Sequence, residues 1–532
     1  MTFAEGGALL AAGRFHEARA AFVQALQREP QSVPARIGLA QALAGGGDKL
    51  SATAWLTDAC RIAPGEPTAM QLLADLLLAQ RQYAQAAPIY RELLERLGLR
   101  NRANLLHAGY CLEQAGKLDG AAQHYRDALA LDASFLEAHV DLAGILWRME
   151  DFEGSLAHAQ RAVQLAPDHP YAVRILGTAL LNLNRLDEAE RVLRQALDLQ
   201  PGFALAQLDL AFTLLLAGRL QEGWAWYEHR WRDTERVRRP AFYVPHAEWQ
   251  GARQQPVAGQ DIAVYAEQGL GDVIQAIRYV PQLEALGARV HCVIQPELVP
   301  VVQASFPRVH CLAPGENLQV HVHAALMELP GRFDTALATI PAPVSYLQSP
   351  EQRRPAWRER LRPAEGRFKL GLCWSGAPGQ VNNRNRGVPL SLLEPFTRLP
   401  GVQCYSLQKG DAAGFTDAEV DAARLVDLTP EWRDFGDSAA MIEQLDLVVT
   451  VDTVIAHLAG ALGKPVWILL PPNADWRWLL EREDSPWYPS ARLFRRGFGE
   501  PRAVQVGRVM AALQQGLGNW PAPALERNTT SP

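Results

Sequence analysis

The chain has 532 residues, a formal net charge of −6 and a pI of about 6.1. This length suits two or three domains, and an acidic balance without any strongly basic stretch argues against nucleic-acid binding. No run of about 18 apolar residues predicts a transmembrane helix, the first residues lack a signal-peptide pattern, and the six cysteines lack Cys-x-x-Cys spacing. We therefore expect a cytoplasmic protein.

The first part of the chain repeats with a period of 34 residues. Prolines mark this period, with gaps of 34, 103 and 34 residues, at Pro30, Pro64, Pro167 and Pro201. Small residues recur at one phase, at Ala18, Ala52, Ala86, Ala121 and Ala189. Aromatic residues recur four positions later, at Phe22, Tyr90, Tyr125 and Tyr227. Small residues let two helices approach closely, the aromatic ring fills the neighbouring gap, and proline ends the second helix.

A 34-residue period resembles the tetratricopeptide repeat (TPR). It predicts an α-solenoid of about seven repeats over residues 1–232, with a concave face that binds another protein. A rigid spacer or an oligomerisation module is the alternative. An asparagine ladder for holding peptides is not found, because the matching positions are Gly38, Leu72, His107, Asp141, Ile175 and Asp209.

From about residue 260 the pattern changes to short apolar runs that alternate with helical stretches. The predicted strands are 261–265, 290–294, 368–373, 402–407, 445–451 and 466–470. Such alternation predicts parallel sheets, in two Rossmann-like lobes over 245–350 and 365–515. The stretch 350–367 is a candidate linker between the lobes, and 519–532 is a candidate flexible tail.

Two segments at predicted strand ends have the composition of a ligand site. Gly269, Gly271 and Asp272 lie between a strand and a helix predicted over 273–286. Glycines allow a close approach to a ligand, and the start of a helix attracts anions. An N-cap role for Asp272 is the structural alternative. The segment is not Gly-x-Gly-x-x-Gly, so NAD binding is disfavoured.

The second segment runs from Asp452 and Thr453 to His457. Thr453 and His457 are four residues apart and therefore share one helical face. Backbone N–H groups, a hydroxyl and an imidazole at a helix start suit a diphosphate. A capping Thr453 and a half-buried His457 without a ligand are the alternative interpretation.

Four motifs together resemble the heptosyltransferase-type glycosyltransferases of family 9. They are Gly271-Asp272, the turn Trp374-Ser375-Gly376, Gln408-Lys409 and the segment from Asp452 to Gly463. Glu222-Gly223-Trp224 and the block from Asn473 to Pro489 are similar to bacterial TPR proteins that carry such a domain. The resemblance covers about residues 220–500 and implies a GT-B fold.

The resemblance also implies roles for individual residues. Asp272 corresponds to a proposed general base. Asp452, Thr453 and His457 correspond to the site of the nucleotide-sugar diphosphate, and Lys409 to a lysine that neutralises it. Arg386 lies in a stretch similar to Asn-Asp-Arg-x-Arg-Ser, from which this chain departs at Asn383 and Gly387. Gly269, Gly271, Trp374, Ser375, Gly376 and Gln408 complete the expected site. Neither a metal ion nor a cofactor is implied.

The favoured function is transfer of a sugar from a nucleotide-sugar donor to a protein held by the TPR region, such as flagellin or an adhesin. One alternative is a heptosyltransferase that acts on a lipopolysaccharide-type acceptor. Another is an interaction scaffold with a vestigial GT-B domain. Hydrolysis by Glu267 and Asp272 is disfavoured, because both carboxylates lie on one loop. The aromatic block Trp476, Trp478, Trp487 and Tyr488 is expected to pack rather than to stack on a ligand.

Overall fold

The computed structural model describes residues 2–232, 239–240, 242–316, 318–377, 379–409 and 425–517. The tail expected at 519–532 lies outside these residues. The chain forms two compact units, Met1–Ala179 and Leu180–Pro532. The last repeats therefore belong to the unit that contains the sheets, although the sequence suggested a boundary near residue 232.

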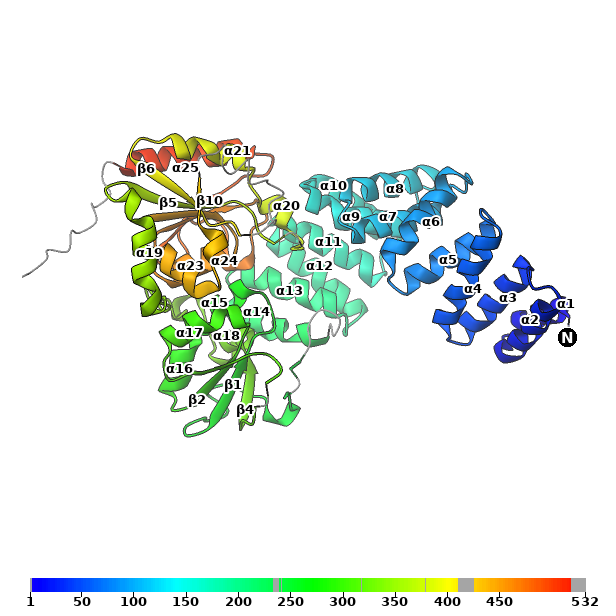
Figure 1. Ribbon diagram of the computed structural model, residues 1–532, viewed down its shortest axis with the longest axis horizontal. Coiled ribbons are helices and arrows are strands. Elements are labelled where there is room, and N and C mark those ends of the chain that lie inside the picture. Colours follow the sequence, from blue (N-terminus) through cyan, green and yellow to red (C-terminus); the bar gives the residue numbers. More distant parts are fainter. Residues whose placement is uncertain are drawn as a thin grey trace, which may run out of the picture. The chain divides into compact units, whose positions relative to one another are not determined.

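Fourteen helices fill the described residues from Phe3 to Tyr227 (Figure 1). Their bounds are α1 Phe3–Ala11, α2 Phe15–Arg28, α3 Val33–Gly45, α4 Lys49–Ile62, α5 Pro67–Ala79, α6 Tyr83–Glu95, α7 Arg102–Gln114, α8 Leu118–Leu131, α9 Leu136–Leu146, α10 Phe152–Leu165, α11 Pro170–Asn182, α12 Leu186–Leu199, α13 Ala204–Leu216 and α14 Leu220–Tyr227. This confirms an all-helical N-terminal region of seven helix pairs. Each of the four period-marking prolines lies two residues beyond the end of a second helix, where its missing N–H costs nothing.

The small and aromatic positions of the repeat pack as predicted. Ala18, Ala52, Ala86 and Ala121 have no exposed surface, and Phe22 is 1% exposed. A Cβ atom on Gly38 would lie 2.4 Å from the Phe22 ring. Only a residue without a side chain fits at that position, because the aromatic ring already fills the space between the helices.

The first sheet has four parallel strands in the order β3-β2-β1-β4. They are β1 Asp261–Tyr265, β2 Arg289–Val293, β3 His310–Leu312 and β4 Val322–Ala325. The α-helices of this lobe are α15 Leu270–Ala276, α16 Val280–Ala285, α17 Val299–Ser305 and α18 Leu329–Arg332.

The single helix predicted over 273–286 was wrong in two respects. It begins three residues earlier, at Leu270, because Gly269 takes the N-cap position. A 3-10 turn at Ile277–Tyr279 then separates α15 from α16. Pro281 lies in the first turn of α16 and has no N–H to continue the hydrogen bonds of a longer helix.

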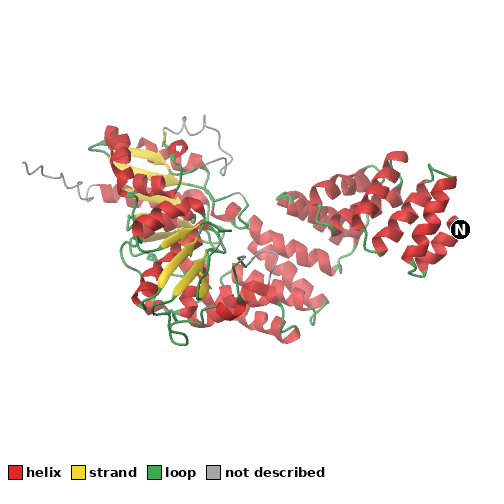
Figure 2. Cartoon of the chain, turned by 60° about the horizontal axis from the view of Figure 1, so that its bottom comes forward, coloured by secondary structure: helices red, strands yellow, loops and turns green. Residues whose placement is uncertain are grey.

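The second sheet has six parallel strands in the order β10-β9-β8-β5-β6-β7. Figure 2 shows the strands in yellow, with red helices packed around them. They are β5 Phe368–Cys373, β6 Val402–Ser406, β7 Val426–Asp427, β8 Leu447–Val451, β9 Val466–Leu470 and β10 Ala491–Arg495. Its α-helices are α19 Arg354–Leu361, α20 Asn383–Arg386, α21 Leu390–Leu393, α23 Phe435–Ile442, α24 Val454–Ala461 and α25 Arg502–Leu517. The candidate linker thus contains a helix, α19, whose Trp357 donates from Nε1 to Asp437 at 3.1 Å.

Strand order reverses once in each sheet, between β1 and β4 and between β5 and β8. In parallel α/β sheets, ligands bind beyond the carboxyl ends of the strands at such a switch point. We therefore expect a ligand-binding site among the residues that follow β1, β5 and β8.

One hydrophobic core joins the last repeat to both sheets. Leu215, Trp224 and Tyr227 from α13 and α14 belong to the same buried cluster as Ile262 of β1 and Val448 of β8. The final repeat is consequently a structural part of the second unit.

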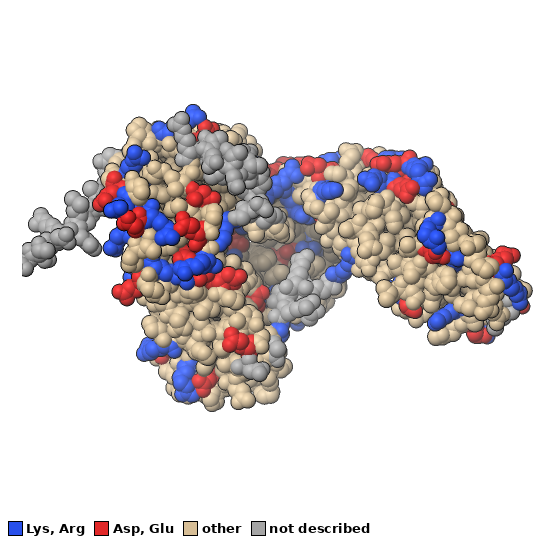
Figure 3. All heavy atoms as spheres, viewed as in Figure 1, with Lys and Arg blue, Asp and Glu red and all other residues tan. Residues whose placement is uncertain are grey.

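Basic and acidic side chains are interspersed on the face shown in Figure 3. Among the described residues, no helix combines the length and the apolar character needed to cross a membrane.

Candidate functional site

A cavity of about 770 Å³ lies within the second unit. Its walls include the loops after β1, β5, β6, β8 and β9, the start of α23, and the helices α13 and α14. Eleven of the twelve residues expected from the sequence line it: Gly269, Gly271, Asp272, Ser375, Gly376, Arg386, Gln408, Lys409, Asp452, Thr453 and His457. The cavity thus adjoins the switch points of both sheets.

Trp374 is the exception, and the expectation that it lines the cavity was wrong. Side chains alternate along β5 and its extension, so Cys373 faces the cavity and Trp374 faces the other side. The Trp374 ring is 1% exposed and packs with Val388 and Leu390 in a separate core.

Asp272 lies at the third residue of α15 rather than at its N-cap. Its Oδ2 accepts a hydrogen bond of 2.8 Å from the N–H of Gly269, the N-cap residue. Its Oδ1 accepts from Nη2 of Arg477. Burial raises the pKa of Asp272, and the Arg477 guanidinium opposes this shift. The result is a half-buried carboxylate held in one orientation at the cavity wall.

Arg477 is a site residue that the sequence analysis missed. Its guanidinium also donates to Oε1 of Gln275 and, at 2.8 Å, to Oδ1 of Asp475, and it lies 4.4 Å from the Trp476 ring centroid. It therefore links the second sheet's lobe to Asp272 in the first. A charged residue between two buried tryptophans was the only sequence signal for this role.

Asp452 and His457 line the cavity at the start of α24, the helix that packs against α15. Burial raises the pKa of Asp452 to about 6, and burial lowers the pKa of His457 well below 6.5. His457 Nε2 lies 4.0 Å from Oδ1 of Asp452, and its Nδ1 lies 2.8 Å from the Tyr488 hydroxyl. The imidazole is therefore neutral near pH 7 and can act as a hydrogen-bonding group rather than as a cation.

Thr453 is the N-cap of α24. Its Oγ1 accepts from the N–H of Ile455 at 3.2 Å, so the helix begins at the cavity. The positive end of the helix dipole favours an anion at this wall.

Three other expected residues, Gln408, Arg386 and Lys409, form hydrogen bonds with backbone groups around the cavity. Gln408 uses Oε1 to accept from the N–H of Ser375 at 2.9 Å, which fixes the turn after β5. Arg386 donates from Nη1 to the carbonyl of Asp452 at 2.7 Å. Lys409 is exposed, and its Nζ donates to the carbonyl of Trp432 at 2.5 Å. Both cations line the cavity, and the contact with Asp452 places Arg386 next to the start of α24.

Asn383 occupies a position at which the family 9 pattern has an acidic residue, and its side chain stabilises the turn after β5. Its Oδ1 accepts from the N–H of Gly376 at 2.9 Å. A Cβ atom on Gly376 would lie 2.1 Å from Nη2 of Arg386, so the turn and the guanidinium are in close contact. The departure at Asn383 therefore retains the geometry that positions Arg386.

The aromatic block packs as expected. Trp478, Trp487 and Tyr488 have at most 1% of their surface exposed. Trp476, which is 4% exposed, reaches the cavity wall, and its ring meets that of Trp224 edge-on at 5.1 Å.

Gly271 is required by the packing of α15 against α24. A Cβ atom there would lie 2.7 Å from Cδ2 of His457, whose ring is fixed by Tyr488. We expect Gly271→Ala to cost about 1–3 kcal/mol in unfolding free energy through overpacking. Gly144→Ala is the matched control, since nothing lies within 4 Å of its Cβ position in α9. Thermal melts of both variants test this expectation, which a normal melt for Gly271→Ala would contradict.

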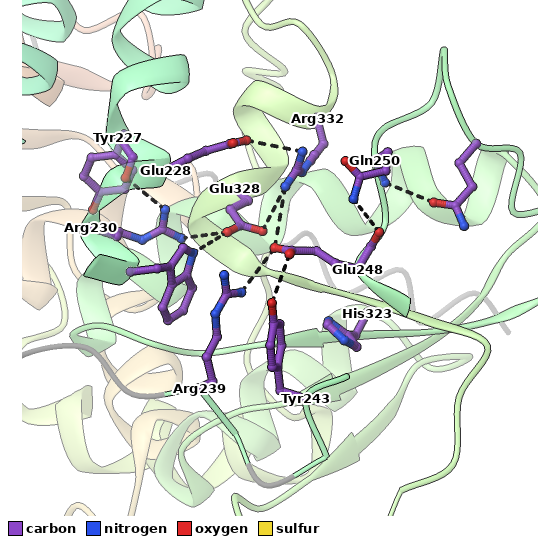
Figure 4. Close-up of polar contacts among 12 residues, drawn as sticks. Tyr227, Glu228, Arg230, Arg239, Tyr243, Glu248, Gln250, His323, Glu328 and Arg332 are labelled. Atoms are coloured by element: carbon purple, nitrogen blue, oxygen red, sulfur yellow. Dashed lines mark hydrogen bonds and ion pairs between the residues drawn. The ribbon is translucent and has the colours of Figure 1, made fainter. Parts of the chain in front are cut away.

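A buried ionic cluster supports the loop that leads to Asp272. Arg230, just beyond α14, donates to Oε1 of Glu267 at 2.9 Å and lies 3.5 Å from Oε1 of Glu328. Figure 4 shows Arg230, Glu328 and Arg332 turned toward one another, with Arg332 Nη2 3.6 Å from Glu328. Glu267 does not line the cavity, and burial raises its pKa to about 7. Its contact with Arg230 anchors the start of the site loop.

In the described part of the chain, no group of three or more His, Cys, Asp or Glu side chains is arranged to hold a metal ion. The polar groups of the cavity are instead carboxylates, cations, a hydroxyl and a helix start. This set suits an anionic organic ligand next to a group that can accept a proton.

Comparison with known proteins identifies the repeats. A family model of the tetratricopeptide repeat matches residues 3–67, 72–134, 114–170, 140–202 and 176–229. The N-terminal region therefore consists of TPR repeats. Protein FlbA of Caulobacter vibrioides is 29% identical over 406 residues, which are 70% of this chain and 66% of FlbA. The match thus spans slightly less than two-thirds of this relative.

Solved structures of TPR proteins match a smaller part. YrrB, described as a TPR protein with an unusual peptide-binding site, is 20% identical with a TM-score of 0.32, over 35% of this chain and 95% of YrrB. MamA of Desulfovibrio magneticus is 19% identical with a TM-score of 0.29, over 30% of this chain and 90% of MamA. A TPR protein of Parabacteroides merdae is 17% identical with a TM-score of 0.35, over 38% and 80%. None of these names assigns a chemistry to the cavity.

Proposed function

We propose that the protein is a glycosyltransferase that moves a sugar from a nucleotide-sugar donor to a hydroxyl of an acceptor protein. One observation carries this proposal. The half-buried carboxylate of Asp272, beside the first sheet, lines the same cavity as Arg386, Lys409 and the start of α24 beside the second. Two lobes with parallel sheets and a shared cavity at their strand ends are also the arrangement expected of a GT-B enzyme.

The chemistry divides between two sets of cavity residues. Asp272 takes the proton of the acceptor hydroxyl while that oxygen bonds to the anomeric carbon. The bond from this carbon to the diphosphate breaks, and the diphosphate leaves with the electron pair. Arg386, Lys409 and the N–H groups at Thr453 stabilise the charge that develops on it, which is usually the largest contribution to such catalysis.

The surroundings of Asp272 suit a side chain that acts as a general base. Burial moves its pKa upward, toward the working pH, where a general base is most effective. Arg477 limits this rise and favours the ionised form that can accept a proton. The TPR repeats supply the protein-binding part, which leads us to favour a protein acceptor over a lipopolysaccharide-type acceptor.

Donor binding is the direct test of this proposal. We expect one member of a panel of UDP-, GDP-, ADP- and CMP-sugars to raise the melting temperature by several degrees, because a ligand at about 100 times its Kd stabilises by about 2.7 kcal/mol. Lys409→Gln should weaken that donor about tenfold, by loss of a charge-assisted contact to phosphate. Lys369→Gln, in the first half of β5, is the control and should bind normally.

The Asp452→Asn variant is a second test of donor binding. It keeps the shape of the side chain but removes a negative charge beside the start of α24, so the donor-induced shift should be retained or increased if the diphosphate binds there. If no nucleotide sugar stabilises the wild-type protein at millimolar concentration, the transferase proposal fails and a scaffold function is favoured.

A further inference from the structure

The last TPR repeat contributes directly to the wall of the cavity. Phe212 of α13 and Tyr227 of α14 both line it, with their ring centroids 5.9 Å apart. Phe212 is half-buried, and Tyr227 is buried except for the part of its ring that reaches the cavity. These two rings lie in the same compact unit as Asp272.

This wall is held rigidly against both lobes. The Trp224 ring of α14 meets the Trp476 ring edge-on, and its Cβ lies 3.1 Å from the Cβ position of Gly331. Asn184, in the turn after α11, donates to the carbonyl of Pro472 at 2.9 Å. Gln221 of α14 donates to the carbonyl of Asp334 at 3.2 Å. A wall fixed at several points can position a ligand without a large loss of entropy on binding.

The wall is adjacent to the residue that would receive the acceptor's proton. Tyr227 accepts a hydrogen bond at its hydroxyl from Nε2 of Gln268, four residues before Asp272. Asp272 also contributes to the rise in the pKa of Tyr227, which indicates that the carboxylate and the phenol are close. Arg386, one of the cations that suit the donor diphosphate, instead donates to the carbonyl of Asp452 next to the start of α24. The aromatic wall therefore belongs to the acceptor side.

The chemistry of this wall favours a polypeptide. Two aromatic rings offer contact area to apolar side chains, while Gln268 and the Tyr227 hydroxyl offer hydrogen bonds to backbone amides. Neither ring carries a charge that would select a phosphorylated lipid headgroup. Both rings belong to a repeat fold that commonly binds peptides.

We propose that Phe212 and Tyr227 are specificity-determining residues that hold a serine- or threonine-bearing peptide segment of the acceptor protein against Asp272. This inference rests on the proposed glycosyltransferase function and adds that the last repeat is itself part of the acceptor site.

The experiment uses the full chain, the nucleotide sugar that stabilises it, and a pool of synthetic peptides with a central serine or threonine. Phe212→Ala and Tyr227→Phe are compared with Tyr110→Ala and Tyr125→Phe. The control residues occupy the same positions of the fourth TPR repeat, on α7 and α8, where they do not line the cavity. Donor affinity is measured by thermal shift and sugar transfer by the mass of the peptides.

We expect Phe212→Ala to raise the peptide KM at least tenfold with donor affinity unchanged, as for a buried aromatic anchor at an interface. Tyr227→Phe should raise it less, and both controls should behave as the wild type. Because Phe212 is only half-buried, its alanine variant is expected to fold, and its donor-induced shift verifies this in the same assay.

Three results would overturn the inference: an unchanged peptide KM in Phe212→Ala, a loss of donor affinity in that variant, or transfer by the wild type to a saccharide acceptor but to no peptide. Failure of the proposed function itself is distinct, since the wild type would then bind no donor at all.

Discussion

Asp272→Asn is expected to lower the rate of sugar transfer by about 10²–10⁴-fold, the usual contribution of a general base. The amide keeps an oxygen that can accept from the N–H of Gly269, so α15 should retain its start. It cannot take a proton from the acceptor hydroxyl. Donor affinity should change little, because the side chain of Asp272 pairs with Gly269 and Arg477 rather than with Arg386 or Lys409, the cations that suit the diphosphate. The measurement is the release of nucleoside diphosphate in the presence of acceptor.

Glu188→Gln is the matched control for this substitution. Glu188 is also a carboxylate at the third position of a helix, α12, and it pairs there with Arg185 outside the cavity. Its loss should leave transfer unchanged. Full activity of Asp272→Asn, in a protein that still binds donor, would remove Asp272 from the base role.

Much of the fold could be predicted because its signals are local. The 34-residue period reports helix-to-helix packing within and between neighbouring repeats, and the apolar runs report buried parallel strands. Most candidate site residues were also predicted, since residues after parallel strands meet at one edge of each sheet. The prediction for Trp374 was wrong, because a position directly after a strand does not determine on which face of the sheet the side chain lies. Its ring packs in a separate core, away from the cavity.

The contacts that could not be predicted from the sequence join residues that are far apart along the chain. Arg477 is 205 residues from Asp272, and Glu328 is 98 residues from Arg230. Ion pairs at such separations depend on the packing of lobes and of the last repeat, about which periodicity carries no information. The grouping of the last repeat with the sheets in one compact unit depends on such packing as well. The repeat continues to α14, but the core of its last helices is shared with the sheets.

The largest effect on stability is expected at Arg230. Arg230→Met leaves Glu267 without its ion-pair partner in the interior and weakens the pairing of Glu328. Breaking a buried pair in this way costs about 3–5 kcal/mol. Arg219→Met is the control, because Arg219 precedes the same helix but forms partly exposed pairs with Glu190 and Glu222, which are worth about 1 kcal/mol or less. Urea unfolding followed by tryptophan fluorescence compares the two, and equal losses would contradict a special role for Arg230.

Because of Glu267, the unfolding free energy of the protein should decrease as the pH rises. Burial raises its pKa in the folded chain to about 7, from an ordinary value of 4.5. Folding therefore takes up a proton between these two pH values, and the stability contributed by this group falls as pH rises through that window, by about 3 kcal/mol in all. Glu267→Gln cannot ionise and should lose this decline. From pH 5 to pH 8 the unfolding free energy of the wild type should therefore fall relative to that of Glu267→Gln. A difference that is constant over this range would mean that Arg230 keeps Glu267 ionised throughout and that the carboxylate contributes only through that pair.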